Sequence, residues 1–123
     1  MFSLKIFKPK RNPEKRHVIS IIGKVVKFLK IKEIDYDVYT NIENGHKVLY
    51  RVEFKKPIKM STEDYDRLIH LLWKLNSRFK LAIIEDQRNE IGCEDCYDIK
   101  IYIDREEVDG VIYIKNIRFE ERL

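Results

Sequence analysis

Three charged residues on two predicted strands could form a metal-dependent catalytic site. Asp35 lies at the start of one predicted strand, and Glu53 and Lys55 share one face of the next strand. With a three-residue turn at 43–45, Asp35 lies directly opposite Glu53, with the two Cβ atoms about 5 Å apart. Two carboxylates at this distance repel each other unless a cation lies between them, and Mg²⁺ suits a site made of oxygen ligands. Lys55 could then stabilise a developing charge or orient a water molecule.

An acidic residue followed on the next strand by Glu-x-Lys resembles the arrangement found in the PD-(D/E)xK nucleases. The resemblance covers Asp35, Glu53 and Lys55, has no Pro-Asp pair, and lies on strands whose predicted order differs from that family's fold. It implies a Mg²⁺-dependent nuclease. The competing interpretation is a solvated strand face on which Lys55 pairs with either acid. We adopt this second interpretation, and therefore assign no catalytic residue, no metal site and no cofactor.

Cys93 and Cys96 form a Cys-x-x-Cys motif before the last two predicted strands. The motif supplies two of the four ligands that a zinc ion needs. Glu94 and Asp95 lie between the two thiols and disfavour the thiolate that a thioredoxin-type site requires. We expect a disulfide within the loop or two unpaired thiols, and the alternative is a zinc ion shared across a dimer.

Positive charge is the broadest functional signal. The net charge is +4, and residues 1–31 hold nine Lys and Arg against one acidic residue, whereas residues 91–123 hold five against nine. This polarity can steer a polyanion to one end of the molecule, or pair two subunits head to tail. If both predicted helices lie on the same side of a sheet, their basic stripes form one surface that contacts phosphates without reading sequence. The predicted nucleic-acid-binding residues are Lys8, Lys10, Arg11, Arg16, Lys24, Lys27, Arg67, Lys74 and Arg78.

Two other interpretations bear on this prediction. The basic stripes could be an ordinary solvated surface in a chain of which 37% is charged. Alternatively, the sheet itself could bind RNA, which requires exposed aromatic residues on central strands. The predicted strand around residues 46–55 offers Leu49, Arg51, Glu53 and Lys55 instead, so we do not expect binding on the sheet face.

Composition limits the compartment and the class of partner. No run of about 18 apolar residues exists, so no membrane partner is expected, and the first residues do not form a signal peptide. The protein is therefore expected in the cytoplasm, or in the host cytoplasm if it is viral. The 18 Ile and 16 Lys against one Ala and one Gln are typical of an AT-rich genome and a hot environment. No small-molecule substrate is evident.

Hydrophobic spacing predicts the elements that position these residues. Apolar positions three and four apart predict a helix from Glu14 to about Ile31, and Ser61 with Asp64 predicts the capped start of a second helix. Alternation predicts strands at 34–42 and 48–55, and a short apolar run predicts one at 80–86. Further strands are expected at 2–7, 97–105 and 111–119. The β-α-β-β-α-β order predicts an α+β fold of the ferredoxin-like type, a two-layer sandwich with an antiparallel sheet and both helices on one face. We expect one domain, 1–123, with 2–86 as the core and 97–119 as an extra C-terminal β-hairpin.

The predicted C-terminal hairpin is apolar on both faces. One face carries Ile99, Ile101, Ile103, Ile117 and Phe119, and the other carries Tyr102, Ile112 and Ile114. Each apolar face of such a hairpin must be buried, one against the rest of its own domain and the other against a second molecule. We therefore expect a homodimer with Tyr102, Ile112 and Ile114 at the interface. The third functional hypothesis is accordingly a dimeric protein-interaction or structural module.

Overall fold

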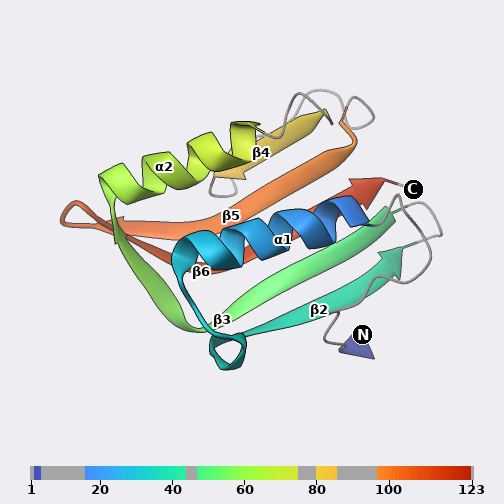
Figure 1. The fold of residues 1–123 in the computed structure, drawn as a ribbon, viewed down its shortest axis with the longest axis horizontal. Coiled ribbons are helices and arrows are strands. Elements are labelled where there is room, and N and C mark those ends of the chain that lie inside the picture. The colour runs from blue at the N-terminus through green and yellow to red at the C-terminus, as the bar shows by residue number, and fades with distance from the viewer. Residues whose placement is uncertain (1, 4–15, 44–46, 75–79, 86–96, 123) are drawn as a thin grey trace.

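A computed structural model of the chain describes residues 2–3, 16–43, 47–74, 80–85 and 97–122. The protein has an α+β fold, in which one sheet carries both α-helices on the same face (Figure 1). A short 3₁₀ helix, η2, precedes the second strand. In chain order the elements are β1 (Phe2–Ser3), α1 (Arg16–Leu29), η2 (Glu33–Asp35), β2 (Tyr36–Glu43), β3 (Lys47–Ser61), α2 (Thr62–Trp73), β4 (Leu81–Glu85), β5 (Ile99–Val108) and β6 (Val111–Arg122).

The sheet is mixed, and its strand order is β1-β2-β3-β6-β5-β4. Only β4 and β5 run parallel, and every other neighbouring pair is antiparallel. The predicted α+β class is confirmed, but the ferredoxin-like order is wrong. The C-terminal hairpin is inserted between β3 and β4, where it forms the centre of the sheet. The reason is burial, since Ile101, Ile103 and Phe119 of this hairpin are at most 1% exposed and a central strand is the best covered position.

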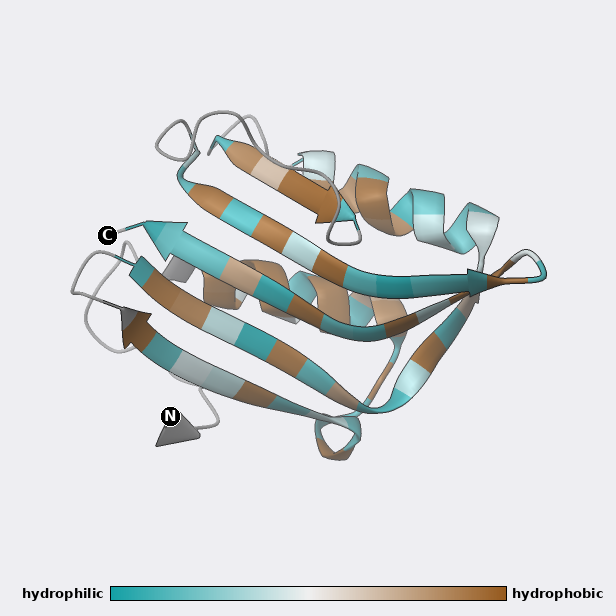
Figure 2. Cartoon of the chain, turned by 180° about the vertical axis from the view of Figure 1, so that it is seen from behind, coloured by the Kyte–Doolittle hydropathy of each residue, from teal (hydrophilic) through white to brown (hydrophobic). Residues whose placement is uncertain are grey.

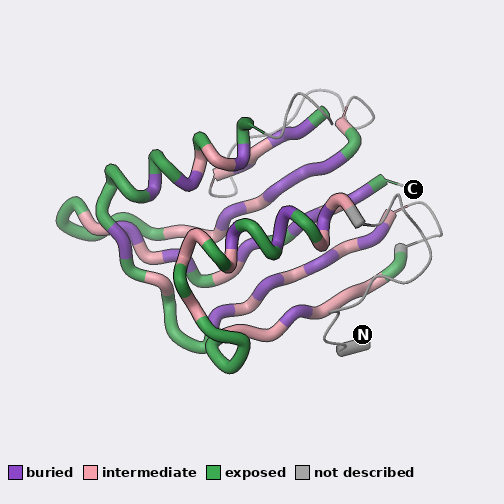
Figure 3. The backbone as a smooth tube through the Cα atoms, in the orientation of Figure 1, coloured by how far each residue is buried: buried purple, intermediate pink, exposed green. Residues whose placement is uncertain are grey.

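The core lies between the sheet and the two helices. Its residues on β3 and β5 largely alternate with polar ones, as the hydropathy colours in Figure 2 and the burial colours in Figure 3 show, whereas β4 is apolar at four of its five positions. Each fully buried side chain of this kind stabilises the fold by about 1.5–3 kcal/mol. The helices contribute Val18, Ile21, Ile22, Val25, Tyr65, Leu68 and Leu72.

The second helix begins where the sequence predicts. The Ser61 Oγ accepts a hydrogen bond from the Asp64 backbone N–H at 3.1 Å. This bond satisfies one of the backbone donors that the first helical turn leaves without an intrahelical partner. Within the described ranges, no helix combines the length and the hydropathy needed to cross a bilayer.

The β2–β3 register differs from the predicted one by two residues. Tyr36 pairs with Phe54, and Asp37 pairs with Glu53, so that Asp35 has no place in the ladder. A shift of two residues keeps the same side chains on the buried face, so hydrophobic alternation alone does not distinguish the two registers. The predicted opposition of Asp35 and Glu53 is therefore wrong, and the turn itself lies outside the described residues.

A β-bulge at Lys115 reverses the predicted faces of the C-terminal hairpin. Asp104 pairs with Asn116 and Arg105 pairs with Ile114, so β6 has one residue more than β5 at this point. Because of this extra residue, the apolar residues on both sides of the bulge point to the same face of the sheet. Ile112 and Ile114, which are 2% and 0% exposed, therefore pack in the same core as Ile117 and Phe119.

The prediction of a two-faced hairpin is thus wrong. Ile112 and Ile114 are buried within the chain itself, so they have no surface to offer as a dimer interface. Val108 pairs with Val111 across a two-residue turn, in which Asp109 and Gly110 have φ of 52° and 76°. Two positive φ values are those of a type I′ turn. The homodimer stays a prediction.

The third strand continues beyond its predicted end at residue 55 and includes Pro57. Four residues of β3, 54–57, face the single residue Lys115 of β6 before pairing resumes at Ile58. Proline is tolerated here because a bulged segment needs no ladder N–H from it. The bulge bends β3, so that its last residues lead directly into α2 (Figure 1).

Candidate functional site

The sheet face that points away from the helices carries the candidate site. In the described part of the chain no helix or strand covers this face, which is seen directly in Figure 2. We call it the open face. At its β4 end, Ala82 and Ile84 are nevertheless buried, at 6% and 5% exposure. The accessible part therefore extends over β2, β3 and β6 and includes Tyr102 and Asp104 of β5, whereas Lys100 of β5 is 5% exposed.

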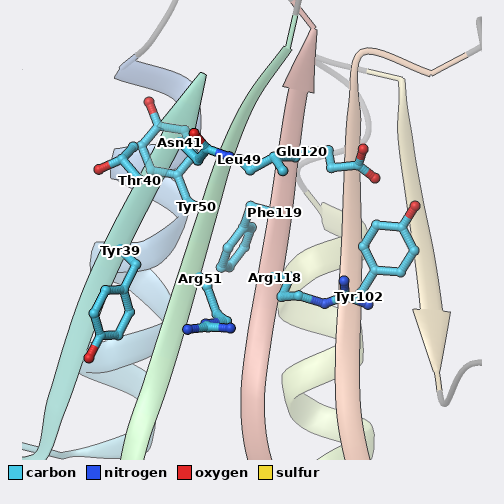
Figure 4. Close-up of a pocket in the computed structure, with 10 residues that line it drawn as sticks. All are labelled: Tyr39, Thr40, Asn41, Leu49, Tyr50, Arg51, Tyr102, Arg118, Phe119 and Glu120. Atoms are coloured by element: carbon cyan, nitrogen blue, oxygen red, sulfur yellow. The ribbon is translucent and has the colours of Figure 1, made fainter. Parts of the chain in front are cut away.

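Four side chains from four adjacent strands form a row across the open face. Tyr39 of β2 pairs with Arg51 of β3, Arg51 pairs with Arg118 of β6, and Arg118 pairs with Tyr102 of β5. We call these four residues the Tyr-Arg row, and Figure 4 shows them side by side. Three inter-strand spacings separate the two end residues, which amounts to about 14 Å.

Each arginine of the row stacks on the tyrosine beside it. The Arg51 Cζ lies 5.1 Å from the centroid of the Tyr39 ring, and the Arg118 Cζ lies 4.8 Å from that of Tyr102. A cation–π contact of this kind contributes about 0.5–1 kcal/mol at an exposed site. The rings therefore hold both guanidinium groups in place on the sheet before any ligand arrives.

The two arginines bring like charges together at the centre of the row. Directly opposed like charges on neighbouring strands destabilise a sheet. The Arg51 Nε lies 3.1 Å from the Glu53 Oε2, which balances one of the two charges. Arg118 is exposed, and among the described residues no carboxylate forms an ion pair with it. The pair therefore holds positive charge that an anion from solution would neutralise.

A hollow of about 400 Å³ lies over the same strands. The Tyr-Arg row lines it together with Asn41, Leu49 and Glu120, among others (Figure 4). This volume is at the lower end of the range for ligand pockets. Leu49 supplies an apolar surface beside the arginines, so the hollow offers both a flat apolar contact and cationic donors.

An acidic row lies next to the Tyr-Arg row, two residues along each strand. It consists of Asp37, Glu53, Asn116 and Asp104, in that order across the sheet. The Asn116 Nδ2 donates a hydrogen bond to the Asp104 Oδ2 at 2.9 Å. No cluster of three or more metal-binding side chains occurs in the part of the chain that the structure describes. The row makes one side of the open face repel anions.

The predicted nuclease residues do not form one site. Asp35 lies in η2, where its Oδ2 accepts a hydrogen bond from the Lys32 backbone N–H at 2.8 Å. Asp35 and Lys55 line a common hollow beside the β3 bulge, but Glu53 does not line it. Glu53 lies on the open face with Arg51 instead. The resemblance to the PD-(D/E)xK nucleases therefore does not extend to the geometry of these three residues.

The predicted basic helix surface is present in part. Lys24 and Lys27 are exposed on α1, and Lys74 is exposed at the end of α2. On α2 the Arg67 Nη1 lies 2.8 Å from the Asp64 Oδ1, so the Asp64 carboxylate balances the charge of Arg67. The exposed surface of α2 also carries further acidic residues, Glu63 and Asp66.

The structure does not describe the side chains of the other residues that the sequence predicts for nucleic-acid binding. Arg16 opens α1, and the structure does not describe its side chain. Lys8, Lys10, Arg11 and Arg78 lie outside the described residues, as do Cys93 and Cys96. The helix side of the molecule is thus a second cationic surface, more mixed in charge than the sequence predicts.

A partly buried polar cluster on the helix side has a structural role. The Tyr65 Oη donates a hydrogen bond to the Glu85 Oε1 at 2.6 Å, and the Arg105 Nε lies 3.7 Å from the same oxygen. The Arg105 guanidinium also lies 4.9 Å from the centroid of the Tyr65 ring. Burial and, next, the hydrogen bond to Glu85 raise the pKa of Tyr65 above its ordinary value, so the hydroxyl stays a donor. The cluster ties α2 to β4 and β5.

Sequence reasoning missed the Tyr-Arg row because its members come from four strands. The outward position of Arg51 follows from alternation, but the aromatic residues lie on its neighbours and not on its own strand. The row could have been found from the residues that alternate with the apolar ones on the other strands, because Tyr39, Tyr102 and Arg118 are large side chains at those positions. In comparisons with protein-family models, curated proteins and solved structures, the chain matches none.

Proposed function

We propose that the protein binds nucleic acid without cleaving it, and that the open face is its principal binding surface. The observation that carries the proposal is the pair Arg51 and Arg118 at the centre of the Tyr-Arg row, opposed across two strands. Guanidinium groups bind phosphate oxygens through two parallel hydrogen bonds, which are among the strongest that proteins make. A phosphate between the two groups would also remove their mutual repulsion.

A polyanion fits this surface better than an isolated small anion. The chain carries a net charge of +4 and has a pI of about 9.0, so it attracts negatively charged polymers at neutral pH. The Tyr-Arg row extends over four strands, which is longer than a single phosphate group needs. Lys24 and Lys27 on α1 would then make additional, weaker phosphate contacts on the helix side, as the sequence predicts.

The proposal assigns no catalytic step to this surface. Two carboxylates lie beside the arginine pair, and each is engaged in an ion pair, Glu53 with Arg51 and Glu120 with Lys47. Positioning of phosphates is therefore the role that the arrangement supports.

A binding assay with charge-matched variants tests the proposal. Fluorescence anisotropy of a labelled oligonucleotide of about 16 nucleotides, the upper end of common site sizes, gives the affinity over a series of salt concentrations. The double variant Arg51→Ala, Arg118→Ala removes two positive charges from the open face. The double variant Lys24→Ala, Lys27→Ala removes two from the helix side and is the matched control.

We expect the open-face variant to bind at least about tenfold more weakly than the control variant, because hydrogen bonds to charged groups are worth about 1.5–3 kcal/mol each. Its slope of log K against log salt should fall by about 1.4, since each phosphate contact on a single strand contributes about 0.7. Equal losses in the two variants, or a larger loss in the helix variant, would move the site to the helix side. Absence of binding by the folded native protein would reject the function itself.

A further inference from the structure

Resting on the proposed function, we infer that the open face takes single-stranded nucleic acid, with bases stacked on Tyr39 and Tyr102 and phosphates at Arg51 and Arg118. The two rings stand at the ends of the Tyr-Arg row, on either side of the arginine pair (Figure 4). Both are partly exposed. Aromatic rings and guanidinium planes are the surfaces on which proteins stack the bases of single strands.

The width of the open face excludes a duplex from the tyrosine rings. The major groove of B-DNA is about 12 Å wide and admits an α-helix or a two-stranded ribbon. The Tyr-Arg row spans four strands, or about 14 Å between its end residues, without counting the side chains. In a duplex the bases also stack on one another, so their faces are not available to a protein ring. Only an unpaired strand can contact both rings.

The spacing of the two rings also sets the state of the bound strand. Bases that stack on each other rise by about 3.4 Å per nucleotide, so neighbouring bases of an ordered stack cannot reach both rings at about 14 Å. The strand must therefore be splayed over the sheet, with its bases turned onto protein groups. The phosphates between the two bound bases then pass over the arginine pair, where the uncompensated positive charge lies.

The surroundings of the row favour one path for the strand. On one side, the acidic row places Asp37, Glu53 and Asp104 two residues along the strands, where they repel a phosphate backbone. On the other side, Leu49 offers an apolar surface for a base within the hollow, and the Glu120 carboxylate there lies 3.6 Å from the Lys47 Nζ, which balances its charge. The strand should therefore cross β2, β3, β6 and β5 along the Tyr-Arg row and its hollow, and not along the acidic row.

Ring substitutions test the stacking directly. In Tyr39→Leu and Tyr102→Leu an apolar side chain replaces each ring, whereas Tyr39→Phe and Tyr102→Phe keep the ring and are the matched controls. The ligands are a single-stranded oligonucleotide, the duplex of the same sequence, and inorganic polyphosphate as a polyanion without bases. Circular dichroism establishes that each variant is folded.

We expect each leucine variant to bind the single strand about 5- to 150-fold more weakly, the range for loss of one stacked base, and each phenylalanine variant to bind as the native protein does. Polyphosphate binding should weaken by at most about fivefold in the leucine variants, because they lose only the cation–π contact that holds each arginine. It should be unchanged in the phenylalanine variants, which keep the ring. The native protein should prefer the single strand to the duplex by at least about tenfold.

Photo-crosslinking supplies a readout that does not depend on substitutions. With an oligonucleotide that carries 5-bromouracil, the crosslinked peptides of the native protein should contain Tyr39 and Tyr102. Equal binding of duplex and single strand, leucine variants that bind like the native protein, or crosslinks confined to α1 and α2 would each overturn the inference. In those cases an arginine-dependent affinity would still support the proposed function, whereas failure to bind any nucleic acid would reject both.

Discussion

Replacement of Ile114 by alanine tests the bulged arrangement of the central hairpin. Ile114 is 0% exposed and lies in the core, because the bulge at Lys115 turns it to the helix side of the sheet. The substitution removes three carbon atoms, which at about 0.8 kcal/mol for each buried group costs about 2.4 kcal/mol in transfer free energy. The cavity left behind adds to this cost, so we expect the free energy of unfolding to fall by about 3–4 kcal/mol.

The matched control is Ile34→Ala, the same chemical change at a residue that is 69% exposed on η2. Its free energy of unfolding should stay within about 0.5 kcal/mol of the native value. Urea denaturation followed by circular dichroism measures both variants, and size-exclusion chromatography of the native protein and both variants measures their oligomeric state.

A small destabilisation of Ile114→Ala, close to that of Ile34→Ala, would refute the reasoning. The same holds for a variant that keeps its stability and only shifts from a dimer to a monomer. Either result would place Ile114 on an outer surface of the hairpin and restore the two-faced arrangement that alternation alone predicts.

Three further substitutions follow from local geometry. Ser61→Ala removes the cap of α2 and should lower the free energy of unfolding by about 1 kcal/mol in urea denaturation, whereas Ser61→Asn should not. Gly110→Ala places a Cβ at φ +76° and should cost about 1–2 kcal/mol by the same measurement, although space around the residue is open. Burial and then the charge of Glu121 raise the pKa of Tyr50 to about 12 from 10.0. The protonated hydroxyl therefore favours the folded state below pH 10, and this contribution is lost as the pH rises to 12. When the pH rises from 10 to 12, the free energy of unfolding of Tyr50→Phe, measured in urea, should therefore fall less than that of the native protein. An equal fall in both proteins would contradict the role given to Tyr50.

Local signals in the sequence predicted the elements well. Ser61 and Asp64 mark the start of α2 because a side-chain cap depends on residues only three apart. The alternation from Val48 to Phe54 marks β3 because one face of that strand is buried. These features depend on neighbours along the chain, and the chain alone therefore specifies them.

Lateral order and register depend on contacts between distant segments. The β2–β3 ladder shifts by two residues without exposing any apolar residue, so Asp37 and not Asp35 faces Glu53. The bulge at Lys115 turns the residues of β6 that precede it to the opposite face from the one that simple alternation predicts. Without the bulge, Ile112 and Ile114 would lie on the face opposite Ile117 and Phe119, and the hairpin would be apolar on both faces. The central place of the hairpin follows from the packing of the whole sheet, which no single segment encodes.

The candidate site was unpredictable for the same reason. Arg51 alone looks like a solvated strand residue, and Arg118 looks like a charge on the last strand. Only the strand order β2-β3-β6-β5 places both between Tyr39 and Tyr102. The row forms only when the four strands pair in this order, so no short sequence motif identifies it.

The most direct test of the binding surface is nuclear magnetic resonance of the arginine side chains during titration with a single-stranded oligonucleotide. The Nε–Hε signals of Arg51 and Arg118 report contact with a phosphate at those two groups. We predict that both signals shift in step with binding, while the backbone amides of Lys24 and Lys27 on α1 shift little. Saturable binding that moves the α1 and α2 signals and leaves both arginine signals in place would contradict the account.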